Sequence, residues 1–259
     1  MSVEMPVAPQ APALETRGLC KSFGALTVAD AIDFRLERGA RQALIGPNGA
    51  GKTTFVELVS GGLSPSAGQI LIDGVEVTDL PQAARVKRGL ARTFQINTLF
   101  PRLTALEAVT LAVCERQGHA STWWRSLPAY RDAIDEAYAI LGSLALGADC
   151  YRLTRTLAYG QQRLLEIALA LATRPKVLLL DEPAAGVPRG QSPALFGAIA
   201  GLSRDITVLF IEHDMDVVFR FASRIIVMVG GRVLVEGTPQ EIAADARVRE
   251  VYLGQTRHA

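Results

Sequence analysis

The sequence has few cysteines, almost no net charge and no long apolar run, and each shortage argues against a class of protein. Its three cysteines, Cys20, Cys114 and Cys150, are scattered through 259 residues with no C-x-x-C pair. We therefore expect small buried thiols in a reducing compartment, not a disulfide framework. A net charge of +1 gives no basic footprint of the kind that nucleic-acid binding leaves in a composition.

Membrane-spanning and targeting segments are not indicated either. No run of about 18 apolar residues occurs, so the chain is not expected to span a membrane by itself. The first residues, MSVEMPVAPQAPA, have neither a basic start nor an apolar stretch, so they do not predict a secretory signal. Their prolines predict a flexible tail over residues 1–12. With no internal repeat and no low-complexity linker, the rest is long enough for one domain with a sizeable core.

What the sequence does contain is an alternation of strand and helix patterns. In the first third we expect short strands, among them residues 42–46, before a glycine loop, and residues 69–74, which end in an Asp-Gly turn. In the middle third the apolar spacing becomes helical, with helices expected at 104–117, 130–146 and 160–173. The last third alternates again, with strands at 177–181, 206–213 and 224–230, helices at 192–204 and 215–222, and a strand, turn and short helix over 232–242. Apolar strands between helices favour an α/β fold whose parallel sheet is covered on both faces.

Residues 46–54 read GPNGAGKTT and match the phosphate-loop pattern G-x-x-x-x-G-K-[ST]. Glycines let backbone N–H groups turn inward around a phosphate, and the following helix adds its positive end. Lys52 would place its charge on the β and γ oxygens, and Thr53 would offer a hydroxyl to Mg²⁺. The loop follows an apolar strand and opens an expected helix from Lys52 to about Ser60, and this context indicates nucleotide binding. The other predicted nucleotide-binding residues of the loop are Gly46, Asn48, Gly49, Gly51 and Thr54.

Two adjacent acids, Asp181 and Glu182, end the apolar strand pattern of residues 177–180. At the strand tip, Asp181 can reach Mg²⁺ through water. Glu182 points elsewhere and can polarise an attacking water, a role that typically contributes about 10²–10⁴-fold in rate. Taken alone, the pair also fits two solvated acids at a strand end. The phosphate loop upstream favours the metal and water roles.

Five motifs follow in the order found in the nucleotide-binding subunits of ABC transporters, and nearly the whole chain resembles that family. They are the phosphate loop, ARTFQ at 91–95, LAYGQQR at 157–163, LLLDEP at 178–183 and IEHD at 211–214. The resemblance implies a P-loop NTPase (RecA-like) core with a mixed sheet and an inserted α-helical subdomain. It also implies a single ATPase domain over 13–259, with the core at 13–95 and 166–259 and the helical subdomain at 96–165.

The resemblance implies roles for single residues as well. Gln95 would contact Mg²⁺ and the attacking water and would sense the membrane subunits. His213 would hold the γ-phosphate and the water together with Glu182, so that these three residues form the catalytic set. Phe23, in KSFG, has the place of a family aromatic that stacks on adenine, although it also fits a core aromatic.

The stretch LAYGQQR departs from the Leu-Ser-Gly-Gly-Gln that is usual in the family. There, this loop of one subunit closes on the ATP held by the other. Ala158 has no hydroxyl and Tyr159 replaces a glycine, but Gly160, Gln161 and the helix N-terminus remain to meet the nucleotide. One lost hydrogen bond to a charged group costs roughly 1.5–3 kcal/mol, so ATP binding is expected to survive with weaker closure. Pro188 is a second departure, because the family commonly has Asp there and proline offers neither a carboxylate nor an N–H.

Further stretches narrow the resemblance to the ATPase subunits of branched-chain amino-acid importers, the Liv type: DEPAAG, IEHDMDVV, EGTP and VYLGQ. This branch implies ATP and Mg²⁺ as cofactors and a peripheral location at the cytoplasmic face of the inner membrane. Its partners would be two integral membrane permease subunits and, indirectly, an extracytoplasmic solute-binding protein, but no nucleic acid. Because of Ala158 and Pro188, we expect a heterodimer with a second ABC ATPase chain rather than a homodimer.

Our leading hypothesis is an ATPase subunit that powers import of branched-chain amino acids or related small polar or aromatic solutes. A lipopolysaccharide-type exporter ATPase shares much of this sequence, although LAYGQQR argues against it. A soluble ABC ATPase of ribosomes or DNA usually has two ATPase halves or a long coiled-coil insertion, and neither pattern occurs here. One feature stays open: Trp123 and Trp124, between two expected helices, either fasten a loop or contact a membrane subunit or lipid headgroups.

Overall fold

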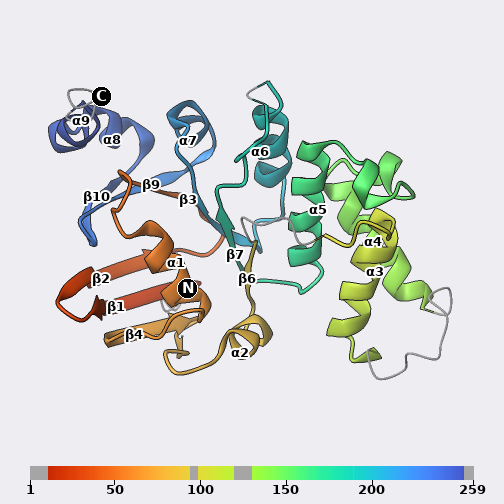
Figure 1. The fold of residues 1–259 in the computed structure, drawn as a ribbon, viewed down its shortest axis with the longest axis horizontal. Helices are drawn as coiled ribbons and strands as arrows, with labels where there is room; N and C mark the ends of the chain where they lie inside the picture. Colours follow the sequence, from red (N-terminus) through yellow and green to blue (C-terminus); the bar gives the residue numbers. More distant parts are fainter. Residues whose placement is uncertain (1–10, 94–98, 120–129, 189, 254–259) are drawn as a thin grey trace, which may run out of the picture.

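The computed structural model describes residues 11–93, 99–119, 130–188 and 190–253, and its larger sheet has the strand order β10-β9-β3-β8-β7-β6 (Figure 1). Five of these strands, from β9 to β6, pair in parallel, and β10 pairs antiparallel with β9. The strands are β3 (Arg41–Ile45), β6 (Leu90–Arg92), β7 (Val177–Asp181), β8 (Thr207–Ile211), β9 (Arg224–Val229) and β10 (Arg232–Gly237). The sheet is therefore mixed, as expected.

The side chains of β7 show why both faces of this sheet are covered. Val177 and Leu179 belong to one core cluster, and Leu178 and Leu180 belong to the other. All four are almost completely buried, because successive side chains of a strand point to opposite faces. A continuous apolar strand is thus explained by two apolar layers, and the predicted parallel sheet with two covered faces is confirmed.

A second sheet, which is antiparallel, has the order β2-β1-β4-β5. Its strands are β1 (Leu14–Phe23), β2 (Leu26–Leu36), β4 (Ala67–Ile72) and β5 (Val75–Glu76). The predicted Asp-Gly turn joins β4 to β5, with φ of 52° at Asp73 and 77° at Gly74, as a tight hairpin requires. This sheet shares a core cluster with the larger sheet and with α1 (Lys52–Ser60), where the rings of Phe34 and Phe55 meet edge to face at 5.2 Å. The sequence pattern had not separated it from the parallel sheet.

Three helices pack against one another at the end of the molecule away from β10 (Figure 1). They are α3 (Ala105–Arg116), α4 (Arg131–Ser143) and α5 (Tyr159–Leu171), which confirms the three helices expected in the middle third to within a few residues. Thr104 begins α3 with a capping box, because its hydroxyl accepts from the Glu107 N–H and Glu107 accepts from the Thr104 N–H. Residue 165, the predicted subdomain boundary, lies inside α5, and the division of the domain stays a prediction.

The other helices are α2 (Gln82–Lys87), α6 (Ser192–Ala200), α7 (Met215–Phe221), α8 (Pro239–Ala244) and α9 (Ala246–Leu253), with short 3-10 turns at Gly147–Asp149 and Thr154–Thr156. Two ends in the last third were predicted too far along the chain, by four and by two residues. α6 ends four residues early, at Ala200 before Gly201, and β8 ends at Ile211, which leaves Glu212 and His213 in a loop. Within the described ranges, a helix with the length and apolar character for a membrane crossing is not found.

Candidate active site

The phosphate loop lies between the end of β3 and the start of α1, where a parallel strand leads into a helix N-terminus. Close packing explains two of its glycines. A Cβ on Gly46 would lie 2.2 Å from the carbonyl oxygen of Met228, and a Cβ on Gly51 would lie 2.7 Å from that of Val28. Gly51 also has a φ of 97° as the N-cap of α1, in the left-handed region that glycine tolerates. The resulting loop is of the kind that binds phosphate at a helix N-terminus.

Lys52 is the charged side chain of this loop. Its Nζ donates to the carbonyl oxygens of Gly46, at 2.7 Å, and Pro47, at 3.0 Å. Burial lowers the pKa of Lys52, while the carboxylates of Glu182 and Asp181 act in the opposite direction. Bonds from an ammonium group to anionic oxygens are stronger than bonds to carbonyls. A phosphate group can therefore replace these two carbonyl partners.

Asp181, the last residue of β7, is held by an ion pair that the sequence did not predict. Arg92 of β6 donates through Nη2 to Asp181 Oδ2 at 3.1 Å and through Nη1 to Glu57 Oε1 of α1 at 2.7 Å. Burial raises the pKa of Asp181, and Arg92 opposes this rise. Arg92 thus joins β6 to β7 and to α1, the helix that follows the phosphate loop. Its partners lie 35 and 89 positions away in the sequence, so no local pattern could reveal it.

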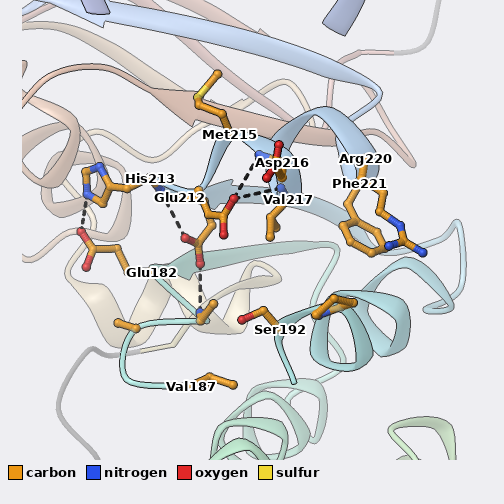
Figure 2. A pocket seen from close by; sticks show the side chains of 14 residues that line it. Glu182, Val187, Ser192, Glu212, His213, Met215, Asp216, Val217, Arg220 and Phe221 are labelled. Carbon is orange, nitrogen blue, oxygen red and sulfur yellow. Dashed lines mark hydrogen bonds and ion pairs between the residues drawn. The ribbon is translucent and has the colours of Figure 1, made fainter. Parts of the chain in front are cut away.

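Glu182 and His213, which sequence analysis paired as catalytic residues, meet in the structure (Figure 2). The His213 Nε2 and Glu182 Oε1 atoms are 2.8 Å apart. Both side chains are partly exposed, at 48% and 30%, so water and a nucleotide can reach them. Glu182 has a φ of 48°, which is unusual for a residue other than glycine and is typical of functional sites. Its N–H is anchored on the Ile211 carbonyl at 3.1 Å.

A cleft of about 700 Å³ lies beside this pair, between the turn after Glu182, the start of α6 and helix α7 (Figure 2). Glu212 lies at its buried side. It stands inside the quoted motif IEHD, but sequence analysis assigned it no role beside His213. Asp214 caps α7 by accepting from the N–H groups of Asp216 and Val217. The His213 loop is therefore fixed on both sides.

Phe23 ends β1 beside the hairpin turn to β2, and the residue is 51% exposed. The ring is not part of the core, so that alternative is wrong, and the stacking role stays a prediction. Lys21 Nζ lies 5.0 Å from the ring centroid, which shows that the face of the ring is accessible to a polar group. Gln95, Trp123 and Trp124 lie outside the described residues.

The stretch LAYGQQR forms the start of α5, with Ala158 as the N-cap residue. Ala158 provides no side-chain cap, which serine would supply. Gln161 compensates in part: its Oε1 accepts from the Ala158 N–H at 3.0 Å, and its Nε2 donates to Asp149 at 2.6 Å. The Gln161 side chain is thus engaged within its own chain, and the nucleotide-binding roles of Ala158, Gly160 and Gln161 stay predictions.

Tyr159 joins this helix start to the turn after Glu182. A Cβ on Gly186, whose φ is 77°, would lie 2.9 Å from the Tyr159 hydroxyl oxygen, so the ring packs directly on the glycine. The hydroxyl accepts from Arg163 Nη2 at 2.9 Å, and Arg163 also pairs with Glu166 at 2.8 Å. Tyr159 therefore has a defined structural place.

The residues present fit a magnesium nucleotide. Among the described residues, no group of three or more His, Cys, Asp or Glu side chains is arranged to hold a metal by itself. Mg²⁺ in nucleotide sites is usually held by one or two carboxylates together with the phosphates. Asp181 at its strand tip and the exposed Thr53 at the start of α1 supply such a partial set of ligands.

The fold and the site together define a P-loop NTPase in which the loop, the acids and the histidine follow strands of one parallel sheet. The family model described as "ABC transporter" matches residues 29–185. The chain belongs to the ABC transporter family and is an ATP-binding ATPase of that family. A second model, "Branched-chain amino acid ATP-binding cassette transporter", matches residues 232–258.

Two named relatives are similar over nearly the full length. The high-affinity branched-chain amino acid transport ATP-binding protein BraF of Pseudomonas aeruginosa is 38% identical, over 94% of this chain and 98% of the relative. LivG of Escherichia coli, with the same description, is 36% identical over the same shares. Among solved structures, the ADP conformation of MJ1267, an ATP-binding cassette of an ABC transporter, has a TM-score of 0.82 and 30% identity, covering 93% of this chain and 98% of that one. These likenesses confirm the predicted fold and ATPase class.

Proposed function

We propose that this chain hydrolyses ATP with Mg²⁺ to power the import of branched-chain amino acids or related small polar or aromatic solutes. The observation that carries this proposal is the agreement between the full-length relatives, named for branched-chain amino-acid transport, and the match at residues 232–258. The ATPase itself does not contact the solute, so the solute class comes from this likeness and not from the geometry of the site.

The site geometry supports a division of roles within the hydrolysis. Lys52 and the amides of the phosphate loop bind the β- and γ-phosphates at the start of α1. Asp181 and Thr53 would hold Mg²⁺, and the bound ion would supply positive charge to offset the negative charge of the phosphate oxygens. Glu182 orients and polarises the attacking water, and His213, 2.8 Å from Glu182, holds the carboxylate and the γ-phosphate in register.

The proposed assembly contains two integral membrane permease subunits, with this chain at the cytoplasmic face of the inner membrane. A cavity of about 270 Å³ supports such a contact. It lies between α2, β6 and α5, and its lining includes the apolar side chains of Val86, Leu99 and Leu169. An extracytoplasmic solute-binding protein would deliver the solute from the other side.

The proposed ATPase dimer is a heterodimer, with a second ABC ATPase chain as the partner. Ala158 leaves the N-terminus of α5 without a hydroxyl where the family's loop meets the ATP of the opposite subunit. Pro188 likewise provides no carboxylate or N–H at the turn that faces the other subunit. A partner with the usual residues would give one complete composite site and one weaker site.

The test begins with a tagged chain purified from gently solubilised native membranes. Two integral membrane proteins and a second, different ATPase should co-purify. In proteoliposomes, the purified complex with its solute-binding protein should accumulate labelled leucine when ATP is enclosed, and a complex carrying Glu182→Gln should not. Co-purification of ribosomal or DNA-bound proteins, without membrane subunits, would refute the transport function.

A further inference from the structure

Glu212 is a buried carboxylate that links two loops of the active site. It lies between the end of β8 and His213, and only 5% of its surface is exposed. Its Oε1 accepts from the N–H of Ala184 at 2.9 Å, and its Oε2 accepts from the N–H of His213 at 3.2 Å. The first N–H belongs to the turn after Glu182 and the second to the histidine itself, as Figure 2 shows.

These two bonds complete a closed ring of contacts. Glu182 Oε1 contacts His213 Nε2 at 2.8 Å. From His213 the ring continues through its backbone N–H to the Glu212 carboxylate, then to the Ala184 N–H, and back along two peptide bonds to Glu182. The ring fixes the backbones that carry both members of the pair. The bond from the Glu182 N–H to the Ile211 carbonyl anchors only the Glu182 side, and the Glu212 carboxylate links that side to the backbone of His213.

We propose that Glu212 is a positioning residue of the ATPase reaction, which sets the distance between the Glu182 carboxylate and the His213 imidazole. Glu212 hydrogen-bonds to backbone N–H groups and to neither of these two side chains, so it acts through the backbones of Ala184 and His213. A displacement of about 1 Å in a reacting group can cost about 10²-fold in rate. The distance between the Glu182 carboxylate and the His213 imidazole therefore affects the rate of ATP hydrolysis directly.

A carboxylate is the group that this position requires. Two N–H donors from different loops each meet a separate oxygen of this side chain, so this arrangement needs an acceptor at both positions. Burial raises the pKa of Glu212, and the two N–H groups counteract the rise by stabilising the charged form. Glutamine has the same shape but one acceptor, so its amide NH₂ would oppose one of the two N–H groups and break the ring at that point.

The test compares Glu212→Gln with Glu136→Gln in the assembled transporter. Glu136 is the matched control, because its carboxylate also binds two partners, Arg116 and Arg174, but lies on α4 away from the site. For Glu212→Gln we expect kcat for ATP to fall by about 10- to 100-fold with KM nearly unchanged, since the phosphate loop is untouched. For Glu136→Gln we expect kcat and KM of the wild type.

A second readout reports on His213 without turnover. The chain has three histidines, so the imidazole ¹⁵N signals of the isolated full-length chain can be assigned with a His213→Gln variant. Glu212→Gln should shift the Nε2 signal of His213 and leave the other two histidines in place, whereas Glu136→Gln should leave the His213 signal unchanged.

A folded Glu212→Gln variant with wild-type kcat, or with an unshifted His213 signal, would overturn the proposal. So would equal losses of kcat in both variants, because these would indicate general destabilisation. The inference rests on the ATPase activity and not on the solute. Failure of the import function would show as wild-type complex that hydrolyses ATP without accumulating leucine, which is distinct from either result for Glu212.

Discussion

Replacement of Glu182 by glutamine is expected to retain ATP binding and to remove most of the turnover. The amide keeps the size of the side chain but cannot accept a proton from water, and loss of such a group typically costs about 10²–10⁴-fold in rate. The His213 contact at 2.8 Å would persist in altered form, because the amide can still hydrogen-bond to the ring. The measurement is phosphate release by the assembled complex at saturating ATP, together with the amount of trapped nucleotide.

The control is Glu76→Gln, an exposed carboxylate on β5 far along the antiparallel sheet. It should leave phosphate release unchanged. Steady-state hydrolysis of Glu182→Gln at the wild-type rate would contradict the assignment of Glu182 as the residue that activates water.

At single positions, the sequence predicted the residues of recognised motifs and missed those that act through distant partners. Lys52, Asp181, Glu182 and His213 were found because each has a fixed place in a motif or after an apolar strand. Arg92 and Glu212 stand inside the quoted motifs ARTFQ and IEHD but were given no role, since their contacts reach residues 28 to 89 positions away. The sequence alone offers no signal for such contacts.

Among the contacts between elements, the packing of Tyr159 on Gly186 yields a sharp prediction. Alanine at a φ of 77° costs about 1–2 kcal/mol, and the Cβ would also collide with the tyrosine ring, at 2.9–3.0 Å. Gly118→Ala is the matched control, because Gly118 has a φ of 80° with no atom within 4 Å of a Cβ. Chemical denaturation should show a greater loss of unfolding free energy for Gly186→Ala than for Gly118→Ala.

The double variant Gly186→Ala/Tyr159→Ala separates the two causes. It removes the collision and keeps the strained φ, so the Gly186→Ala substitution should cost less in the Tyr159→Ala background than in the wild type. Equal costs in both backgrounds would mean that the tyrosine does not join the start of α5 to the turn after β7.

The ion pairs of Glu136 give a prediction for pH. Hydrogen bonds from Arg116 lower the pKa of Glu136 to about 2. Burial acts in the opposite direction, and hydrogen bonds from Arg174 add to the lowering. A carboxyl whose pKa is lower in the folded state stabilises the fold at every pH above its unfolded pKa of 4.5. This stabilisation is lost as the pH falls from 4.5 towards the folded pKa of about 2. Glu136→Gln should therefore cost about 1–2 kcal/mol at pH 7.

That difference between wild type and Glu136→Gln should shrink as the pH is lowered from about 4.5, and urea denaturation at a series of pH values measures it. Asp135→Asn, at an exposed neighbouring position on α4, should show a much smaller difference. A constant gap between wild type and Glu136→Gln down to pH 3 would exclude this origin of the stability.

Helices and strands were predicted well where local sequence signals mark their ends. They were predicted less well where pairing between distant strands determines the structure. The helix from Lys52 to Ser60 was correct to the residue because Gly51 and Gly61 limit it at both ends. The antiparallel sheet was not recognised, since β1 and β2 pair with several register shifts and alternate only in part. The C-terminal end of α6 was placed too late because apolar residues continue to Leu202, beyond the helix.

For the whole molecule, the fold was predictable because its central strands are continuous apolar runs in the sequence, and two core clusters bury them on both faces. One cluster lies between the two sheets and the other between the parallel sheet and the helical layer, and both include side chains of β7 and β8. The partner across the ATP site leaves only indirect signals in the sequence, in Ala158 and Pro188. These two residues carry the remaining prediction, which concerns the subunit pairing.

We expect the isolated Glu182→Gln chain to remain monomeric in MgATP and to dimerise when the second ATPase subunit is added. Because the Glu182→Gln chain does not hydrolyse ATP, an ATP-bound dimer would not dissociate through hydrolysis. The absence of a homodimer would therefore mean that the start of α5 binds the ATP of the other subunit weakly. Adding Ala158→Ser restores a hydroxyl, worth roughly 1.5–3 kcal/mol against a charged phosphate and about 10- to 150-fold in the dimer constant for each site. Mass photometry should therefore show homodimers at lower concentrations of the Ala158→Ser/Glu182→Gln chain. A stable homodimer of the Glu182→Gln chain alone would rule out the heterodimer, because Ala158 and Tyr159 would then suffice at both sites.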